Sequence, residues 1–296
     1  MRGVVAALLL WWATACAPVP EPVSDPLLYH PDAFAKADSA VIGIPGALTP
    51  VRVLSPIAGL RTDTRAIAFY RLPGFDGRPA DEFVNLTFAA KRIARAVAQF
   101  DLHQVTLIGH STGAVIALEA AKAIRQTSPD TDVRVIGIST ALPAPQPALA
   151  GVRGAAGTVA AALRVGSLDP RVVWLEYYRY LAYGPAADTD PQVARAADDL
   201  VKANSDRISL PEDGLGRRHT RALRRWTNPD PDAVQGADVI LFHGAVDPIF
   251  PPRATARFAR TLPGAELRLI PGHGHLLLLT YPALWSDIAA LVTNPR

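Results

Sequence analysis

The chain has 296 residues, of which 49% are hydrophobic and 19% are charged, so it can bury a large core and does not have the composition of a disordered protein. Its 30 Lys and Arg residues against 27 Asp and Glu residues leave a net charge of +3, which gives no reason to expect nucleic acid as a partner. The single cysteine cannot form an internal disulfide.

The first residues have the pattern of an export signal. One arginine precedes an apolar run from Val4 to Ala13, which is short for a membrane span, and small residues then lead to Cys16. This end resembles the processing site of bacterial lipoproteins, with Cys16 as the candidate lipidation site; a plain secretory signal and a buried N-terminal helix are the alternatives. We therefore expect residues 1–16 to be a signal segment and residues 17–38, which are rich in proline, to be an extended tether. The protein is then expected to be exported and anchored to a membrane of a bacterial envelope, or otherwise secreted or periplasmic.

From residue 39 onward, β-branched apolar runs alternate with helical segments. Strands are predicted at 39–44, 65–72, 104–108, 133–138, 238–243 and 265–270, and helices at 51–60, 85–100, 112–126, 252–262 and 282–292. This alternation predicts an α/β fold, in which helices cover both faces of a mostly parallel sheet. The core is assigned to residues 39–141 and 236–296. Residues 142–235 lack strong strand patterns and contain short helical pieces, which predicts a helical lid inserted over one end of the sheet.

The sequence GHSTG, residues 109–113, lies between the strand predicted at 104–108 and the helix predicted at 112–126. A serine at such a sharp turn is held in a strained backbone conformation, and flanking glycines let the strand and the helix approach each other. The turn lifts the hydroxyl of Ser111 above the carboxyl end of the sheet and starts a helix directly behind it. The segment therefore matches G-x-S-x-G, the nucleophile elbow. Taken alone, Ser111 could equally be an ordinary helix N-cap.

An acid and a histidine follow the serine in the chain order that this elbow requires. Asp247 follows the strand at 238–243, and both His273 and His275 follow the strand at 265–270. With these segments, about residues 39–293 resemble an α/β-hydrolase-fold serine hydrolase of the esterase and lipase type. The family pattern matches Asp247 as the acid and His275 as the base, with His273 in a variable position.

This resemblance implies a mechanism without a metal or an organic cofactor. His275 would take the proton of Ser111, and Asp247 would orient and stabilise the imidazole ring. The oxyanion would be bound by the backbone N–H groups of Thr112 and Ala47, although the family commonly has histidine where this chain has Pro45. For Asp247, a turn role before Pro248 is the alternative.

Two segments of the predicted insertion leave alternatives open. The basic run 217–226 is either a solvated helix face or a contact with anionic lipid headgroups. The aromatic run 174–183 either lines an acyl pocket or forms the core of the insertion. His273 and His275 have no third ligand at the spacing expected of a metal site.

The sequence thus predicts a serine hydrolase that cleaves a carboxylic ester, or a related acyl bond, of a small-molecule substrate through an acyl-enzyme. A lactonase, thioesterase, amidase or acyltransferase on the same residues is the first alternative. A surface lipoprotein that binds a ligand without turnover is the second. The natural substrate, the acyl length and the oligomeric state do not follow from the sequence.

Overall fold

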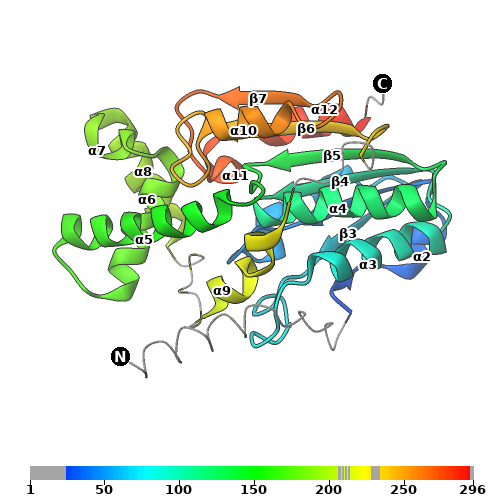
Figure 1. Ribbon diagram of the computed structural model, residues 1–296, viewed down its shortest axis with the longest axis horizontal. Coiled ribbons are helices and arrows are strands. Elements are labelled where there is room, and N and C mark those ends of the chain that lie inside the picture. Colours follow the sequence, from blue (N-terminus) through cyan, green and yellow to red (C-terminus); the bar gives the residue numbers. More distant parts are fainter. Residues whose placement is uncertain are drawn as a thin grey trace, which may run out of the picture.

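A seven-stranded sheet, in the order β1-β3-β2-β4-β5-β6-β7, forms the centre of the molecule (Figure 1). The computed structural model describes residues 25–205, 208, 210, 212, 214–227 and 234–293. The strands are β1 (Leu27–Leu28), β2 (Ser39–Ile44), β3 (Arg65–Tyr70), β4 (Gln104–His110), β5 (Asp132–Ile138), β6 (Asp238–Gly244) and β7 (Glu266–Ile270). All neighbouring strands are parallel except β1, which pairs antiparallel with β3. The predicted α/β fold with a mostly parallel sheet is confirmed.

Helices cover both faces of this sheet because neighbouring side chains of each central strand point to opposite faces. Ile42 and Leu107 face the helices α2 (Pro31–Phe34), α3 (Leu86–Gln99), α4 (Thr112–Thr127) and α10 (Pro252–Ala259). Val41 and Ile108 face η1 (Val51–Leu60), α11 (Leu277–Thr280) and α12 (Leu284–Thr293). The central strands are therefore buried on both faces, as expected of a parallel sheet.

The helices α5 (Gln146–Val165), α6 (Pro170–Tyr183), α7 (Ala186–Thr189), α8 (Pro191–Asn204), α9 (Leu215–Thr220) and η2 (Ala222–Arg225) lie between β5 and β6 in the chain. We call them the insertion helices. Figure 1 shows α5 to α8 gathered beyond the end of the sheet to which the strands point. A small apolar cluster, in which Val173, Tyr177 and Leu181 of α6 meet Leu276, joins them to the core.

The structure differs from the sequence-based expectation in two places. Residues 17–38 were expected to be an extended tether, but within the described part Leu27 and Phe34 are buried in the core, on β1 and α2. The sequence also suggested only short helices in the insertion, whereas α5 has 20 residues despite its glycines. The predicted signal segment with Cys16 lies outside the described residues.

Candidate active site

Ser111 lies at the corner between β4 and α4. Its backbone has φ 50° and ψ −113°, a conformation that is strained for a residue with a Cβ. The two glycines of the motif make the corner possible, since a Cβ at Gly109 would collide with the backbone of α4, and one at Gly113 would collide with the carbonyl oxygen of Ile44. The first helical turn behind Ser111 therefore approaches the end of β2 closely, and the hydroxyl lies at the carboxyl end of the sheet.

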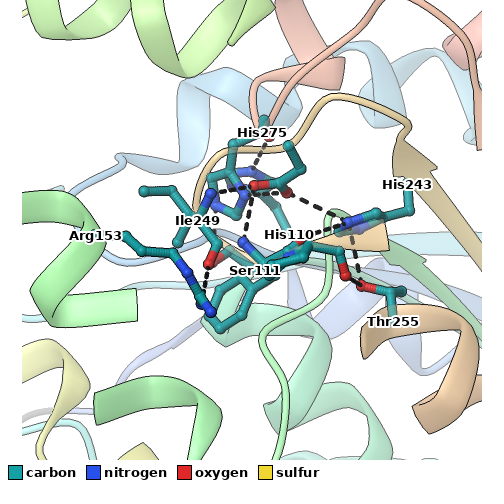
Figure 2. A network of polar contacts seen from close by, with 10 residues as sticks. His110, Ser111, Arg153, His243, Ile249, Thr255 and His275 are labelled. Carbon is teal, nitrogen blue, oxygen red and sulfur yellow. Dashed lines mark hydrogen bonds and ion pairs between the residues drawn. The ribbon is translucent and has the colours of Figure 1, made fainter. Parts of the chain in front are cut away.

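Three side chains from distant parts of the chain form a continuous hydrogen-bonded series at this corner (Figure 2). Nε2 of His275 lies 3.2 Å from Oγ of Ser111, and Nδ1 of the same ring lies 2.8 Å from Oδ2 of Asp247. All three residues are buried. The other candidate base, His273, is half-buried between the rings of Tyr183 and Tyr281 and has no hydrogen bond to either partner of His275.

Asp247 is held as a charged acceptor. Its Oδ1 accepts hydrogen bonds from the backbone N–H groups of Ile249 (2.7 Å) and Phe250 (3.0 Å). Burial by itself would raise the pKa of this carboxyl, but the nearby imidazole of His275, its hydrogen bond and the Phe250 N–H outweigh burial, so the pKa lies below its ordinary value. The carboxylate can therefore orient the His275 ring and stabilise its protonated form.

The backbone of His275 is fixed by an insertion helix. The N–H groups of Gly274 and His275 donate to the carbonyl oxygens of Ala182 and Leu181 at the end of α6, both at 2.7 Å. A second insertion helix reaches the acid loop, where the guanidinium of Arg153 on α5 donates to the carbonyl oxygen of Ile249 (Figure 2). Neither contact could be predicted from local sequence patterns, because the partners are far apart in the chain.

Two other buried histidines lie beside this series and stay neutral. His110 packs its ring 5.4 Å from that of His275, and burial, together with His275, lowers its pKa to about 3. The Nε2–H group of His243 donates to the carbonyl oxygen of Phe250 at 2.8 Å and lies 3.1 Å from Oγ1 of Thr255, and burial lowers the pKa of this ring as well. Because both rings are neutral, they add no positive charge that would disfavour a protonated His275.

The two residues expected to supply oxyanion donors lie at the cavity beside Ser111. Ala47, after β2, and Thr112, the first residue of α4, both line the cavity beside the hydroxyl, and neither N–H has a hydrogen-bond partner in the part of the chain that the structure describes. Unpaired donors beside a nucleophile, at the positive end of a helix, can bind a developing oxyanion.

The loop that carries Ala47 is held by a residue that the sequence did not single out. Nδ1 of His219, on α9, accepts the N–H of Leu48 at 3.1 Å, and its Nε2 lies 2.8 Å from the carbonyl oxygen of Pro73. Leu48 has φ 61°, so this bond stabilises a strained residue directly after Ala47. His219 is fully buried, and burial lowers its pKa to about 4, so the ring is neutral and Nδ1 remains an acceptor. In the sequence, His219 was only one member of a basic run.

A cavity of about 450 Å³ opens from Ser111. Its walls are largely apolar and come from both parts of the fold: small residues of α5, the aromatic residues Trp174, Tyr177 and Tyr178 of α6, and Leu276 beside His275. Among the described lining residues, Arg224 is the only Lys, Arg, Asp or Glu. No group of three or more His, Cys, Asp or Glu that could hold a metal ion occurs among the described residues.

The comparisons with known proteins concern the family and the fold. The family model described as the Alpha/beta hydrolase family matches residues 41–288. The chain is similar in structure to a thermophilic esterase from Thermogutta terrifontis (17% identity, TM-score 0.62, covering 92% of this chain and 94% of that one). It is also similar to an esterase from Exiguobacterium antarcticum (16% identity, TM-score 0.60, covering 90% of this chain and 95% of that one). A third similar structure is the 2-hydroxy-6-oxo-6-phenylhexa-2,4-dienoate hydrolase BphD from Rhodococcus sp. strain RHA1 (17% identity, TM-score 0.57, covering 90% of this chain and 92% of that one). The sequence has no match among curated proteins. At these identities, the structural similarity establishes the fold alone.

Proposed function

Since the chain belongs to the Alpha/beta hydrolase family, we propose that it is a serine hydrolase that cleaves a carboxylic ester through an acyl-enzyme. One observation carries this proposal: the hydrogen-bonded series from Ser111 through His275 to Asp247 ends at an apolar cavity that also presents two unpaired N–H groups. A nucleophile, a base, an orienting acid and an oxyanion site are the parts that acyl transfer requires.

The proposed reaction uses His275 alternately as a base and as an acid. Nε2 of His275 removes the proton of Ser111 as Oγ attacks the acyl carbon, and the carbonyl oxygen, now negative, is bound by the N–H groups of Ala47 and Thr112. The imidazolium then gives the proton to the leaving alcohol, while Asp247 stabilises the charged ring without taking a proton. Water, activated by the same Nε2, releases the acid and restores Ser111.

The cavity supports an apolar substrate. Its volume of about 450 Å³ suits a small molecule, and aromatic rings of α6 with alanines and glycines of α5 offer contacts to an acyl chain or an aromatic group. Arg224 at the rim is compatible with a neutral or anionic ester and disfavours a cationic one. The esterases among the structural neighbours are in line with an ester substrate, whereas lactones, thioesters and amides require direct comparison.

The test is labelling with a fluorophosphonate probe, followed by hydrolysis of 4-nitrophenyl esters of increasing acyl length beside a lactone, a thioester and an amide. We expect labelling and ester hydrolysis in the wild type and neither in Ser111→Ala. His275→Ala is expected to lower kcat by about 10³-fold or more, whereas His273→Ala, two residues away, keeps it within about threefold.

The outcomes separate the alternatives. Activity in His275→Ala together with its loss in His273→Ala would overturn the assignment of the base. Folded protein that is not labelled at Ser111 would favour a ligand-binding role over hydrolysis.

We also propose that the protein is exported and lipidated at Cys16, on the sequence pattern described above. In a bacterial host, metabolic labelling with an alkyne analogue of palmitate is expected to mark the wild type but not Cys16→Ser. Unlabelled protein found free in the periplasm or the medium would favour the plain secretory signal instead.

A further inference from the structure

Helix α5 has two different faces. One face lines the cavity through residues three and four apart, among them Pro147, Ala150, Gly154 and Thr158. The opposite face presents Leu149, Val152, Val159 and Leu163, each at least 43% exposed, and Leu163 is 78% exposed. An ordinary cavity wall would leave polar side chains on its outer face, so the apolar outer face requires its own explanation.

The apolar surface continues past the end of the helix. Leu168, in the loop after α5, is 91% exposed, and Val172 in the first turn of α6 is also exposed. Of the nine large apolar side chains that are exposed in the described part of the chain, six fall between residues 149 and 172. We call these six residues, Leu149, Val152, Val159, Leu163, Leu168 and Val172, the α5 surface. A concentration of this kind marks an interaction site.

The charges beside the start of α5 are mostly basic, whereas farther along Arg164 pairs with Glu176 and Asp188, and Asp169 lies between Leu168 and Val172. Helix α5 contains Arg153 and Arg164 and has no acidic residue, and residues 214–227, which include η2, hold five arginines and no acid. This basic segment is attached to the start of α5, because η2 packs against α5 and the N–H of Ala144 donates to the carbonyl oxygen of Trp226 at 2.9 Å. Figure 1 shows α9 and α5 at the same end of the molecule. Bulky apolar groups flanked by arginine are typical of helices that lie in the headgroup region of an anionic bilayer.

The helix has the length and composition of a membrane span, but its surroundings exclude that role. It is the one helix among the described residues that is long and apolar enough to cross a membrane, and only 11% of its most apolar window is buried. However, its inner face forms the cavity wall and packs on α6, and the guanidinium of Arg153 is bound to the acid loop. Only the outer face is available to a lipid phase.

We propose that the α5 surface docks this protein on an anionic lipid bilayer, with α5 parallel to the membrane plane. Arg224 is exposed and also lines the cavity, so the cavity reaches the surface next to the same basic segment. Docking therefore brings the mouth of the cavity to the lipid. The proposal concerns binding and stands independently of the hydrolase activity and of lipidation at Cys16.

The test measures flotation of the full chain with vesicles of phosphatidylcholine alone or mixed with phosphatidylglycerol. The variant Val159→Asp/Leu163→Asp changes two residues of the α5 surface that do not line the cavity. Leu269→Asp on β7, also an exposed leucine, is the matched control. Since all proteins carry the same N-terminal segment, its contribution to binding is the same throughout.

We expect the wild type to bind the mixed vesicles more tightly than phosphatidylcholine alone, and salt to weaken the binding. The double variant is expected to bind the mixed vesicles about tenfold more weakly or worse, and Leu269→Asp to bind like the wild type. Hydrolysis of a water-soluble ester should be unchanged in both variants, which shows that the fold is intact and separates this test from that of the activity.

Equal vesicle binding by the double variant and the wild type would overturn the proposal. So would sedimentation in solution as a dimer that the double variant converts to a monomer, because the α5 surface would then be an interface between two copies.

Discussion

The ring of His219 makes two hydrogen bonds, and two substitutions of this residue should separate their effects on activity. Nδ1 of His219 accepts the N–H of Leu48, and Nε2 contacts the carbonyl oxygen of Pro73. An asparagine at this position would place its side-chain oxygen near the site of Nδ1 and have nothing at the site of Nε2. A glutamine would reach the Nε2 site with its amide but leave the N–H of Leu48 unpaired.

The two variants should therefore lose similar stability and differ in activity. Each leaves one buried or half-buried backbone group without its partner, at a cost of about 1–3 kcal/mol to the free energy of unfolding. In His219→Gln, Leu48 is also released from its strained φ of 61°, and the Ala47 loop loses its shape. Removal of one oxyanion donor costs about 10²–10³-fold in kcat, so partial displacement should cost His219→Gln at least about tenfold. His219→Asn should stay within about threefold of the wild type.

The measurement is kcat and KM for a chromogenic ester, beside the free energy of unfolding of each variant. Because the donor acts on the transition state, the loss in His219→Gln should fall on kcat and leave KM nearly unchanged. Equal kcat in His219→Gln and the wild type, or an equal fall in both variants, would refute this positioning role of His219.

Three further predictions follow from the buried groups of the site. Asp247→Asn should keep the fold and lower kcat by about 10⁴-fold, because an amide neither selects the ring tautomer nor stabilises the imidazolium; an activity within tenfold of the wild type would contradict this. Gly113→Ala should lower the free energy of unfolding by about 1–3 kcal/mol, because the new Cβ meets the backbone of Ile44. In the same denaturant titration, Gly59→Ala should change the free energy of unfolding little, because the space around Gly59 is open. Burial lowers the pKa of His219 in the folded protein from an ordinary value of 6.5 to about 4. On acidification, the unfolded chain therefore binds the proton first. Between pH 7 and pH 5, the free energy of unfolding of the wild type should decrease by about 2 kcal/mol because of this group. His219→Asn should lack this part of the acid sensitivity, and identical pH profiles would show that the ring is not held neutral.

The sequence predicted the parts of this site that depend on local pattern. The glycines around Ser111 are needed for steric reasons that act within five residues, and Asp247 and His275 follow strands of a parallel sheet whose carboxyl ends must lie together. The proposed oxyanion donors Ala47 and Thr112 were likewise assigned from the family resemblance and from their position after a strand and after Ser111. The contacts that hold the Ala47 loop in place could not be predicted, because no local sequence pattern indicates them.

What the sequence could not predict comes from the insertion helices. His219 contacts Leu48 across 171 residues, and its role depends on where α9 comes to lie, which no period or motif specifies. Helix α5 was not predicted because Gly151, Gly154 and Gly157 lower the helix propensity of its sequence. In the structure, Gly154 and its small neighbours on α5 line the cavity.

The insertion helices also determine how a substrate reaches Ser111. Three of them each bind one loop of the site. A carbonyl oxygen of α6 accepts the N–H of His275, and Arg153 of α5 donates to the carbonyl oxygen of Ile249 beside the proposed acid. His219 of α9 accepts the N–H of Leu48 beside the proposed oxyanion donor. If these helices swung away together as a lid, all three bonds would break, and the base, the acid loop and the oxyanion loop would lose their supports at the moment they are needed. In such an open form, the site that we propose for acyl transfer would therefore not be assembled. Access through a mouth beside Arg224, which is exposed and lines the cavity, would keep every bond. That mouth adjoins the basic segment next to α5, so a substrate dissolved in lipid would enter where the molecule is proposed to meet the bilayer.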